Sequence, residues 1–385
     1  MKKIISILLT GLLVTTAFSG CGKTEEKAEN SNSSAASSNP IVLTDEIREL
    51  TDGFLAVRHT GDYGFDLFLE QGGASSDAEV VSFLMESGIV DFGNLLLGGN
   101  PFGCSTLSVK NAAGDSLFGR NFDWNTCNAM VIQNQPENGY HSISTVNTDF
   151  IRVSGISLSA LPDEIQAIAG LYAPLDGLNE MGLAVSVNMI QDNATIEQNT
   201  DKPDITTTTA IRLLLDKAAD VEEAIKLLGS YDMHASFGYM VHFAIADRTG
   251  NSVVVEYVNN EMIVTKTPAV TNFYLAEGEK NGIGTQQSHE RYEILINRLN
   301  DSETMEMNDV RDTLDSVSKD NFREFERSSQ NGLRSRGSSE TDSECPIETT
   351  EWSIVMNQTT GEVRYYHREN YNNAYAFIVT GGQES

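Results

Sequence analysis

The stretch most suited to chemistry is a cysteine followed by a charged block. Cys104 comes directly after Gly103, and the sequence G-R-N-F-D-W stands at 119–124 after a short turn. This spacing predicts a hairpin with the thiol at the start of one strand and with Arg120 and Asp123 on the other. A cation beside a thiol lowers its pKa and makes it a better nucleophile at neutral pH.

A cut in the chain before Cys104 would add a second catalytic group. The new α-amine, with a reference pKa of about 7.7–8.0, would stand beside its own thiol as a general base. Asp123 would then hold that amine in place. The same residues also fit a buried structural cysteine in a hairpin, so the residues alone leave both interpretations open.

The segments around this hairpin predict an α+β fold. A helix is expected at 75–87, with Ala78, Val81, Phe83 and Leu84 on one face behind Ser and Asp caps, and two more at 220–229 and 288–299. Short turns between the strand-like runs predict antiparallel pairing, and strands with interspersed helices predict packed sheets covered by helices. The expected strands are 104–111, 116–122, 183–190, 239–246, 252–258, 261–266, 352–357 and 363–369.

The common catalytic signatures are missing from the sequence. It has no G-x-S-x-G elbow, P-loop or H-E-x-x-H motif, and no G-x-G-x-x-G after a strand. The six histidines lack ligand spacing, so neither a metal site nor a cofactor is expected. His242 is expected to pack within a strand and His289 to lie on a solvated helix face.

Composition excludes several classes of partner. The chain of 385 residues carries 55 acidic and 26 basic side chains, a formal charge of −29. This charge argues against a nucleic-acid partner and against broad adhesion to anionic lipid. Four cysteines without a C-x-x-C pair exclude a disulfide-dense scaffold and a zinc ribbon. Cys127 and Cys345 are left over, either as a disulfide or as two free thiols.

The N-terminus predicts export and a lipid anchor. Two lysines precede a short apolar run at 4–17, and Ser19-Gly20-Cys21 resembles a bacterial lipobox, which makes 1–21 a lipoprotein signal peptide. Phe18 stands where such boxes usually carry Leu, so an ordinary signal peptide with an incidental cysteine is the alternative. Residues 22–45 are expected to form a disordered tether. We expect an extracytoplasmic protein held to the cell membrane through Cys21, its only membrane contact.

From Cys104 onward the chain resembles the choloylglycine hydrolase and penicillin V acylase group of N-terminal-nucleophile hydrolases, which includes N-acylethanolamine acid amidase and penicillin acyltransferase relatives. The resemblance implies a four-layer αββα sandwich of antiparallel sheets. It extends over about 104–380 in the expected order. The matching blocks are 119–124, D-G-L-N-E-M-G-L at 176–183 with Val187-Asn188, 242–247 with 255–257, 270–272, 291–292 and 350–353.

The resemblance implies a role for each residue of the site. Cys104 would supply Sγ as nucleophile and its α-amine as proton acceptor. Asp123 would orient the amine, and Arg120 would help keep the thiol ionised. The remaining three positions are implied as oxyanion donors and as a positive charge near the thiol: Asn188, Asn272 and Arg291.

Each of these last three positions also has a structural interpretation. Asn188 and Asn272 could be turn or strand-end asparagines, and Arg291 could form a surface ion pair on its helix with the neighbouring glutamates. The chain also departs from the family in two ways. A leader of 103 residues precedes the cysteine, and Ser105 replaces the usual Thr.

The resemblance implies hydrolysis of a linear amide C–N bond in a small N-acyl compound, through a thioester on Cys104. Maturation would be self-cleavage between Gly103 and Cys104, with 46–103 as an N-terminal extension or propeptide and 104–385 as the catalytic domain. Conjugated bile acids, penicillin V-like amides and N-acyl homoserine lactones are candidate substrates. The alternatives are acyl transfer to an amine or peptide acceptor, and a non-catalytic lipid-anchored binding protein. The sequence leaves a homo-oligomer open.

Overall fold

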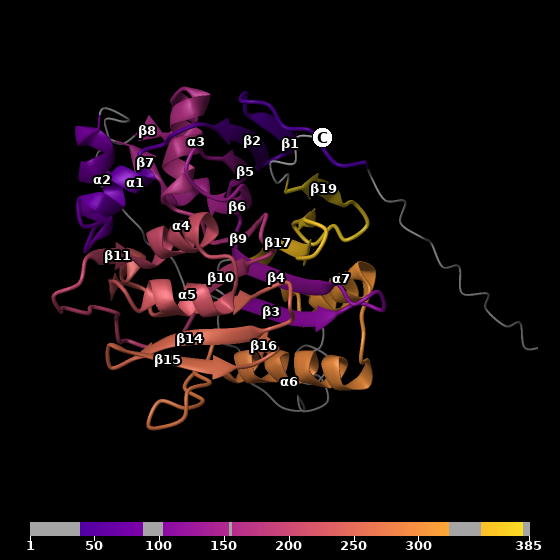
Figure 1. Cartoon of the computed structure of the whole chain (residues 1–385). Coiled ribbons are helices and arrows are strands. Elements are labelled where there is room, and N and C mark those ends of the chain that lie inside the picture. Colours follow the sequence, from indigo (N-terminus) through magenta and orange to yellow (C-terminus); the bar gives the residue numbers. More distant parts are fainter. Residues whose placement is uncertain (1–38, 88–102, 154–155, 323–347, 380–385) are drawn as a thin grey trace, which may run out of the picture. The chain divides into compact units, whose positions relative to one another are not determined.

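Two β-sheets form the centre of the protein (Figure 1). The computed structural model describes residues 39–87, 103–153, 156–322 and 348–379. Within these ranges no helix is both long and apolar enough to cross a membrane.

The larger sheet has nine strands and mixes antiparallel with parallel pairing. In spatial order its strands are β1 (Arg48–Thr51), β2 (Phe54–Thr60), β5 (Ala129–Gln135), β6 (Ser142–Asn147), β9 (Asp176–Asn179), β10 (Ala184–Met189), β13 (Val241–Ala246), β14 (Ser252–Val258) and β15 (Glu261–Lys266).

The smaller sheet has six strands, all antiparallel. Its order is β16 (Ala269–Val270), β3 (Gly103–Lys110), β4 (Ser116–Asn125), β17 (Glu348–Asn357), β18 (Glu362–His367) and β19 (Tyr375–Ile378). Two short ladders lie outside both sheets: β7 (Arg152–Val153) with β8 (Ile156–Ser157), and β11 (Asp204–Thr206) with β12 (Asp232–His234).

Helices cover the outer face of each sheet. On the nine-stranded sheet, α3 (Asp163–Leu171) packs on β2, β5 and β6, α4 (Thr207–Lys217) on β9 and β10, and α5 (Val221–Leu228) on β13 and β14. On the six-stranded sheet, α6 (Gln286–Asp301) packs on β3 and β16, and α7 (Met307–Ser316) on β4 and β17. This order of layers confirms the expected αββα sandwich.

The inner faces of the two sheets meet through buried polar contacts as well as apolar packing. Arg120 on β4 pairs with Asp176 on β9 at 2.9 Å, and the indole of Trp352 on β17 donates to the same carboxylate at 3.0 Å. Thr145 on β6 and Tyr365 on β18 share a hydrogen bond of 2.8 Å. These bonds fix how the sheets are placed relative to each other, and the catalytic candidates lie in this layer.

The segment before the cysteine is built into the nine-stranded sheet. Strand β2 pairs in parallel with β5 over seven residues, from Phe54 opposite Ala129 to Thr60 opposite Gln135. Helix α1 (Phe65–Glu70) buries Phe65 and Phe68. The strands expected from the sequence do pair antiparallel, whereas β2–β5 and β11–β12, which were not among them, pair in parallel.

The expected helix at 75–87 is confirmed as α2 (Asp77–Glu86), capped by the Ser76 side chain. Its buried face differs by one position from the expected one, because Val80 is buried with Phe83 and Leu84 whereas Ala78 is exposed. The small Ala side chain has little apolar area to bury, so the face turns toward the larger Val.

Candidate active site

Cys104 lies in the layer between the two sheets. It is the second residue of β3 and stands opposite Phe122 of β4, which confirms the expected hairpin. Its side chain is completely buried, and Sγ lies 3.8 Å from Nη2 of Arg120. The same guanidinium is held by Asp176 and by a 2.8 Å bond to the carbonyl oxygen of Val187 on β10.

Burial dominates the acidity of the thiol in the uncut chain. It raises the pKa of Cys104 to about 11, against the opposing effect of the Arg120 guanidinium and, more weakly, that of Arg291. The Asp123 carboxylate adds to the rise, and the backbone N–H of Met189 works against it. Arg120 thus acts in the direction expected from the sequence, but the uncut chain keeps its thiol protonated at neutral pH.

Asp123 is fixed through one oxygen and leaves the other without a hydrogen bond. The hydroxyl of Thr350 donates to Oδ1 at 2.7 Å, whereas Oδ2 is buried and accepts none within the described residues. Oδ2 lies 3.5 Å from Nη1 of Arg291, and a Cβ placed on Gly103 would lie only 2.4 Å from it. The carboxylate therefore faces the residue at which the chain is expected to be cut.

Asn272 and Arg291 both bind the backbone of Cys104. Oδ1 of Asn272 accepts from the Cys104 N–H at 2.8 Å and from Nη2 of Arg291 at 2.7 Å. Nη1 of Arg291 donates to the Cys104 carbonyl and to the Ser105 hydroxyl, each at 2.7 Å. Arg291 is 2% exposed, so it forms no surface ion pair. Asn272 is also buried, and it serves as a hydrogen-bond partner of the cysteine rather than as a turn residue.

Asn188 carries a free amide donor on the same side of the sheet. Asn188 on β10 pairs with His242 on β13. Ser186, also on β10, pairs with Asp176 on β9, whose side chain points at the six-stranded sheet. Side chains two residues apart on a strand share a face, so Asn188 points the same way. Its Nδ2 is buried and has no partner among the described residues, whereas Nδ2 of Asn272 donates to the Met189 carbonyl at 2.7 Å. Asn188 therefore offers the less occupied donor.

His242 packs in its strand, as expected, and steadies the segment that carries Asn272. Its Nδ1 contacts Glu256 at 2.9 Å and its Nε2 contacts the Thr271 carbonyl at 2.8 Å. Burial opposes ionisation of Glu256, but the bond from His242 and two backbone N–H donors lower its pKa overall. His289 lies on its helix as expected but is half-buried, since its ring meets that of Phe273 at a tilt with centroids 4.0 Å apart.

Three further residues support the site without having been assigned a role from the sequence. Thr350 binds Asp123, Asp176 binds Arg120, and Lys319 is buried beside Gly103, with Cε 3.1 Å from a Cβ placed there. The Lys319 N–H also donates to the Thr350 hydroxyl at 3.0 Å. Thr350 and Asp176 stand in sequence blocks that match the family, but a lysine after a helix gives no signal of its own.

The other three cysteines are not part of the site as described. Cys127 is a buried free thiol, while Cys345 and Cys21 lie outside the described residues. No group of three or more His, Cys, Asp or Glu residues in the described part of the chain is arranged to hold a metal ion.

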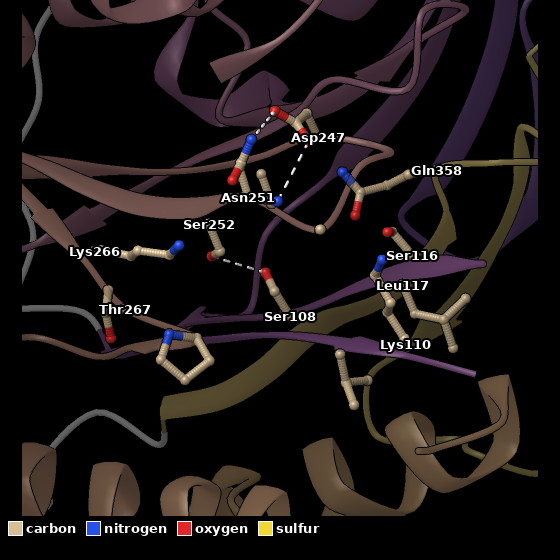
Figure 2. Close-up of a pocket in the computed structure, with 14 residues that line it drawn as sticks. Ser108, Lys110, Ser116, Leu117, Asp247, Asn251, Ser252, Lys266, Thr267 and Gln358 are labelled. Atoms are coloured by element: carbon tan, nitrogen blue, oxygen red, sulfur yellow. Dashed lines mark hydrogen bonds between the residues drawn. The ribbon is translucent and has the colours of Figure 1, made fainter. Parts of the chain in front are cut away.

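A separate hollow of about 190 Å³ lies at the other end of β3, lined by Ser108 and Lys110 with the β13–β14 turn and Lys266 (Figure 2). The carboxylate in this hollow, that of Asp247, is engaged within the β13–β14 turn, where it accepts hydrogen bonds from the backbone N–H groups of Thr249 and Asn251. Four to six residues of extended strand, about 13–20 Å, separate this hollow from Cys104, so it is not part of the site.

Part of the chain is similar to a known family. Residues 104–273 match the choloylglycine hydrolase family of linear amide C–N hydrolases. The match begins at Cys104 and ends one residue after Asn272, so it spans five of the six catalytic candidates, all but Arg291. The resemblance carried by the sequence motifs is confirmed over this range. No curated protein matches the chain significantly.

Solved structures of related enzymes resemble the chain more distantly. Two variants of the conjugated bile acid hydrolase from Clostridium perfringens are 19% and 17% identical to it, each with a TM-score of 0.49 over 71% of this chain and 92% of the hydrolase. Penicillin V acylase from Agrobacterium tumefaciens is 15% identical, with a TM-score of 0.41 over 69% of this chain and 83% of the acylase.

Proposed function

We propose that this protein hydrolyses linear amide C–N bonds of small N-acyl compounds, with Cys104 as an N-terminal nucleophile. The observation that supports this is the set of contacts around one residue. Asn272 binds its backbone nitrogen, Arg120 approaches its sulfur, and Arg291 binds its carbonyl oxygen. A merely structural cysteine has no need of polar groups at all three atoms, each of which costs free energy to bury.

Maturation begins with the thiol of the uncut chain. Sγ attacks the Gly103 carbonyl carbon, a C–S bond forms, and the C–N bond to Cys104 breaks as the nitrogen takes up a proton. Water then hydrolyses the thioester, which releases the Gly103 carboxylate and restores the thiol. The unbonded Oδ2 of Asp123, which faces Gly103, stabilises the positive charge that develops on the freed amine.

The mature site then holds a general base beside its nucleophile. The Cys104 α-amine accepts the thiol proton, and Asp123 and Asn272 orient that amine through the oxygens that face the Cys104 backbone. The thiolate attacks the substrate carbonyl, and the amine returns the proton to the departing amine of the substrate. Nδ2 of Asn188 donates to the oxyanion, a contact of the kind worth about 2.7–4 kcal/mol.

The same proposal includes the place of the enzyme in the cell. A diacylated Cys21 followed by the polar residues 22–40 would hold the catalytic unit outside the membrane. One acyl chain anchors only marginally, so two chains on one cysteine are the physical requirement.

N-terminal sequencing of the purified protein tests the mechanism directly. We expect a chain that begins at Cys104, an uncut Cys104→Ala variant without activity, and amide hydrolysis by the wild type on a panel of chromogenic N-acyl amides. An active wild type with the 103–104 bond intact would contradict an N-terminal nucleophile. Adding a primary amine as acceptor distinguishes transfer, because a transferase would form the new amide in preference to the free acid.

A further inference from the structure

Strand β17 contains an irregularity directly beside the catalytic candidate Asp123. Thr350 stands opposite Asp123 on β4. The next paired residue of β17 is Trp352, opposite Phe122, so Glu351 is an extra residue in the ladder. A β-bulge of this kind bends the strand and re-aims its side chains, and such bulges are common next to active sites. Here the bulge adjoins the Thr350 hydroxyl that binds Oδ1 of Asp123.

The two residues that follow β18 hold this bulge in a strained conformation. Arg368 has φ 46° and Glu369 has φ 60°, in the left-handed region that residues other than glycine rarely adopt. Two such residues in succession persist only where the surrounding contacts hold them. The Arg368 N–H donates to the Glu351 carbonyl oxygen at 2.9 Å, and the Thr350 N–H donates to Oε1 of Glu369 at 2.9 Å. The strained pair therefore binds the backbone of both residues at the bulge.

The Glu369 side chain also joins Thr350 to the segment that carries Lys319. Oε1 of Glu369 accepts a second hydrogen bond, from the Asp320 N–H at 3.3 Å. The preceding N–H, that of Lys319, donates to the Thr350 hydroxyl at 3.0 Å. Thr350 is therefore fixed at two atoms, its backbone nitrogen by Glu369 and its hydroxyl oxygen by Lys319.

The half-buried Glu369 acts here through an acceptor oxygen. Burial, together with the neighbouring Asp320 carboxylate, raises the pKa of Glu369 to about 7, against the hydrogen bond from the Thr350 N–H. A large share of this side chain is therefore neutral at neutral pH. The carbonyl oxygen of a neutral carboxyl group still accepts hydrogen bonds from both N–H groups. The contacts of Glu369 thus depend on its acceptor oxygen rather than on its charge.

We propose that Glu369 is a positioning residue of the Cys104 site, and that it sets the orientation of the Asp123 carboxylate through Thr350. This inference rests on the proposed function, in which Asp123 acts first beside the scissile bond and then on the freed amine. Within the described residues Oδ2 of Asp123 accepts no hydrogen bond, so the Thr350 hydroxyl orients this carboxylate. A displaced Thr350 would let the carboxylate turn away, which would slow self-cleavage and lower kcat. Substrate binding does not involve Glu369, so KM should not change.

The test compares three variants of Glu369 by the rate of self-cleavage and by kcat and KM of the cut enzyme on a chromogenic N-acyl amide. Glu369→Ala removes the acceptor, and Glu369→Asp draws it back by one methylene group but keeps the charge and tolerates the left-handed backbone. Each should lower the cleavage rate and kcat about tenfold, as expected for one well-placed hydrogen bond. Glu369→Gln keeps an acceptor oxygen and should restore most of both rates. Glu362→Ala is the matched control, because Glu362 lies at the other end of β18 and binds Arg364.

Several results would overturn the inference. These are wild-type rates in Glu369→Ala and Glu369→Asp, a Glu369→Gln variant as slow as Glu369→Ala, or a raised KM with kcat unchanged. Thermal unfolding shows whether each variant is folded. If Glu369→Ala does not fold, the comparison of Glu369→Asp with Glu369→Gln decides alone, and equal rates in these two would overturn the inference. A wild type that neither cuts itself nor cleaves any amide would instead refute the proposed function, before any variant is compared.

Discussion

Gly103→Ala should separate maturation from catalysis, because the proposed cut would remove residue 103 from the catalytic chain. A Cβ at this position would lie 2.4 Å from Oδ2 of Asp123 and 3.1 Å from Cε of Lys319. Real Cβ contacts are not shorter than about 3.0 Å, so the Asp123 carboxylate has to move by about 0.6 Å. The Thr350 hydroxyl bond at 2.7 Å resists that movement.

The size of the effect follows from the cost of overpacking. An extra methyl group in a tightly packed site costs about 1–3 kcal/mol. If this cost is expressed in the barrier to self-cleavage, the rate falls by about 5- to 150-fold. The fraction that does cut contains the same chain from Cys104 onward, so its kcat should equal that of the wild type.

A time course on denaturing gels, with active-site titration of the cut fraction, measures both quantities. Gly229→Ala is the control, since the nearest atom to a Cβ there lies at 3.4 Å and cleavage should keep its wild-type rate. Wild-type cleavage by Gly103→Ala would refute the close approach of Asp123 to the scissile bond. Normal cleavage with a reduced kcat would show instead that the leader end acts in catalysis.

Three further predictions concern the same site, and a fourth concerns the membrane anchor. Asn188→Ala should lower kcat more than Asn272→Ala does, with KM little changed for Asn188→Ala. The reason is that Nδ2 of Asn188 has no partner among the described residues, whereas Nδ2 of Asn272 donates to the Met189 carbonyl. A raised KM alone would remove Asn188 from the oxyanion site. Thr350→Val should shift the acidic limb of the kcat/KM pH profile to lower pH, because a loosened carboxylate favours the protonated amine less, whereas Thr350→Ser should restore the profile. In uncut protein, alkylation of Cys104 should still rise with pH beyond 9 and level off near 11; a plateau near 9 would contradict the buried, protonated thiol. Cys21→Ala should release the protein from the membrane fraction, and wild-type protein that is soluble without detergent would refute the anchor.

The motif-bearing parts of the fold were predictable from the sequence. The β3–β4 hairpin, β14, β15 and α2 follow from alternation, turn residues and an N-cap, all of which act over a few neighbouring residues. The family motifs supplied the layer order of the sheets. Both kinds of signal are local or are carried by residue types that chemistry restricts.

The parts that were missed depend on contacts distant in the sequence. The leader strand β2 pairs with β5, about 75 residues away, and the run F-L-A-V-R-H-T gives no sign of a parallel partner. The roles of Thr350 and Lys319 depend on β17 meeting β4, which local patterns do not encode. The thiol's protonation was also not foreseeable, because complete burial outweighs the adjacent guanidinium only once the sheets are packed.

The proposed cut is compatible with the position of the leader in the fold. The bond between Gly103 and Cys104 lies at the very start of β3, so its cleavage would remove one strand residue and leave the remaining ladder with β4 intact. The leader is held elsewhere, through β2 on the nine-stranded sheet and through the buried rings of Phe54, Phe65 and Phe68. Each such ring stabilises the folded state by about 1.5–3 kcal/mol when fully buried. Loss of the leader would also expose the backbone edge of β5. The proposed cut at this one bond would therefore free the amine that the proposed mechanism requires, while the contacts of the leader would keep the two chains together as one folded unit.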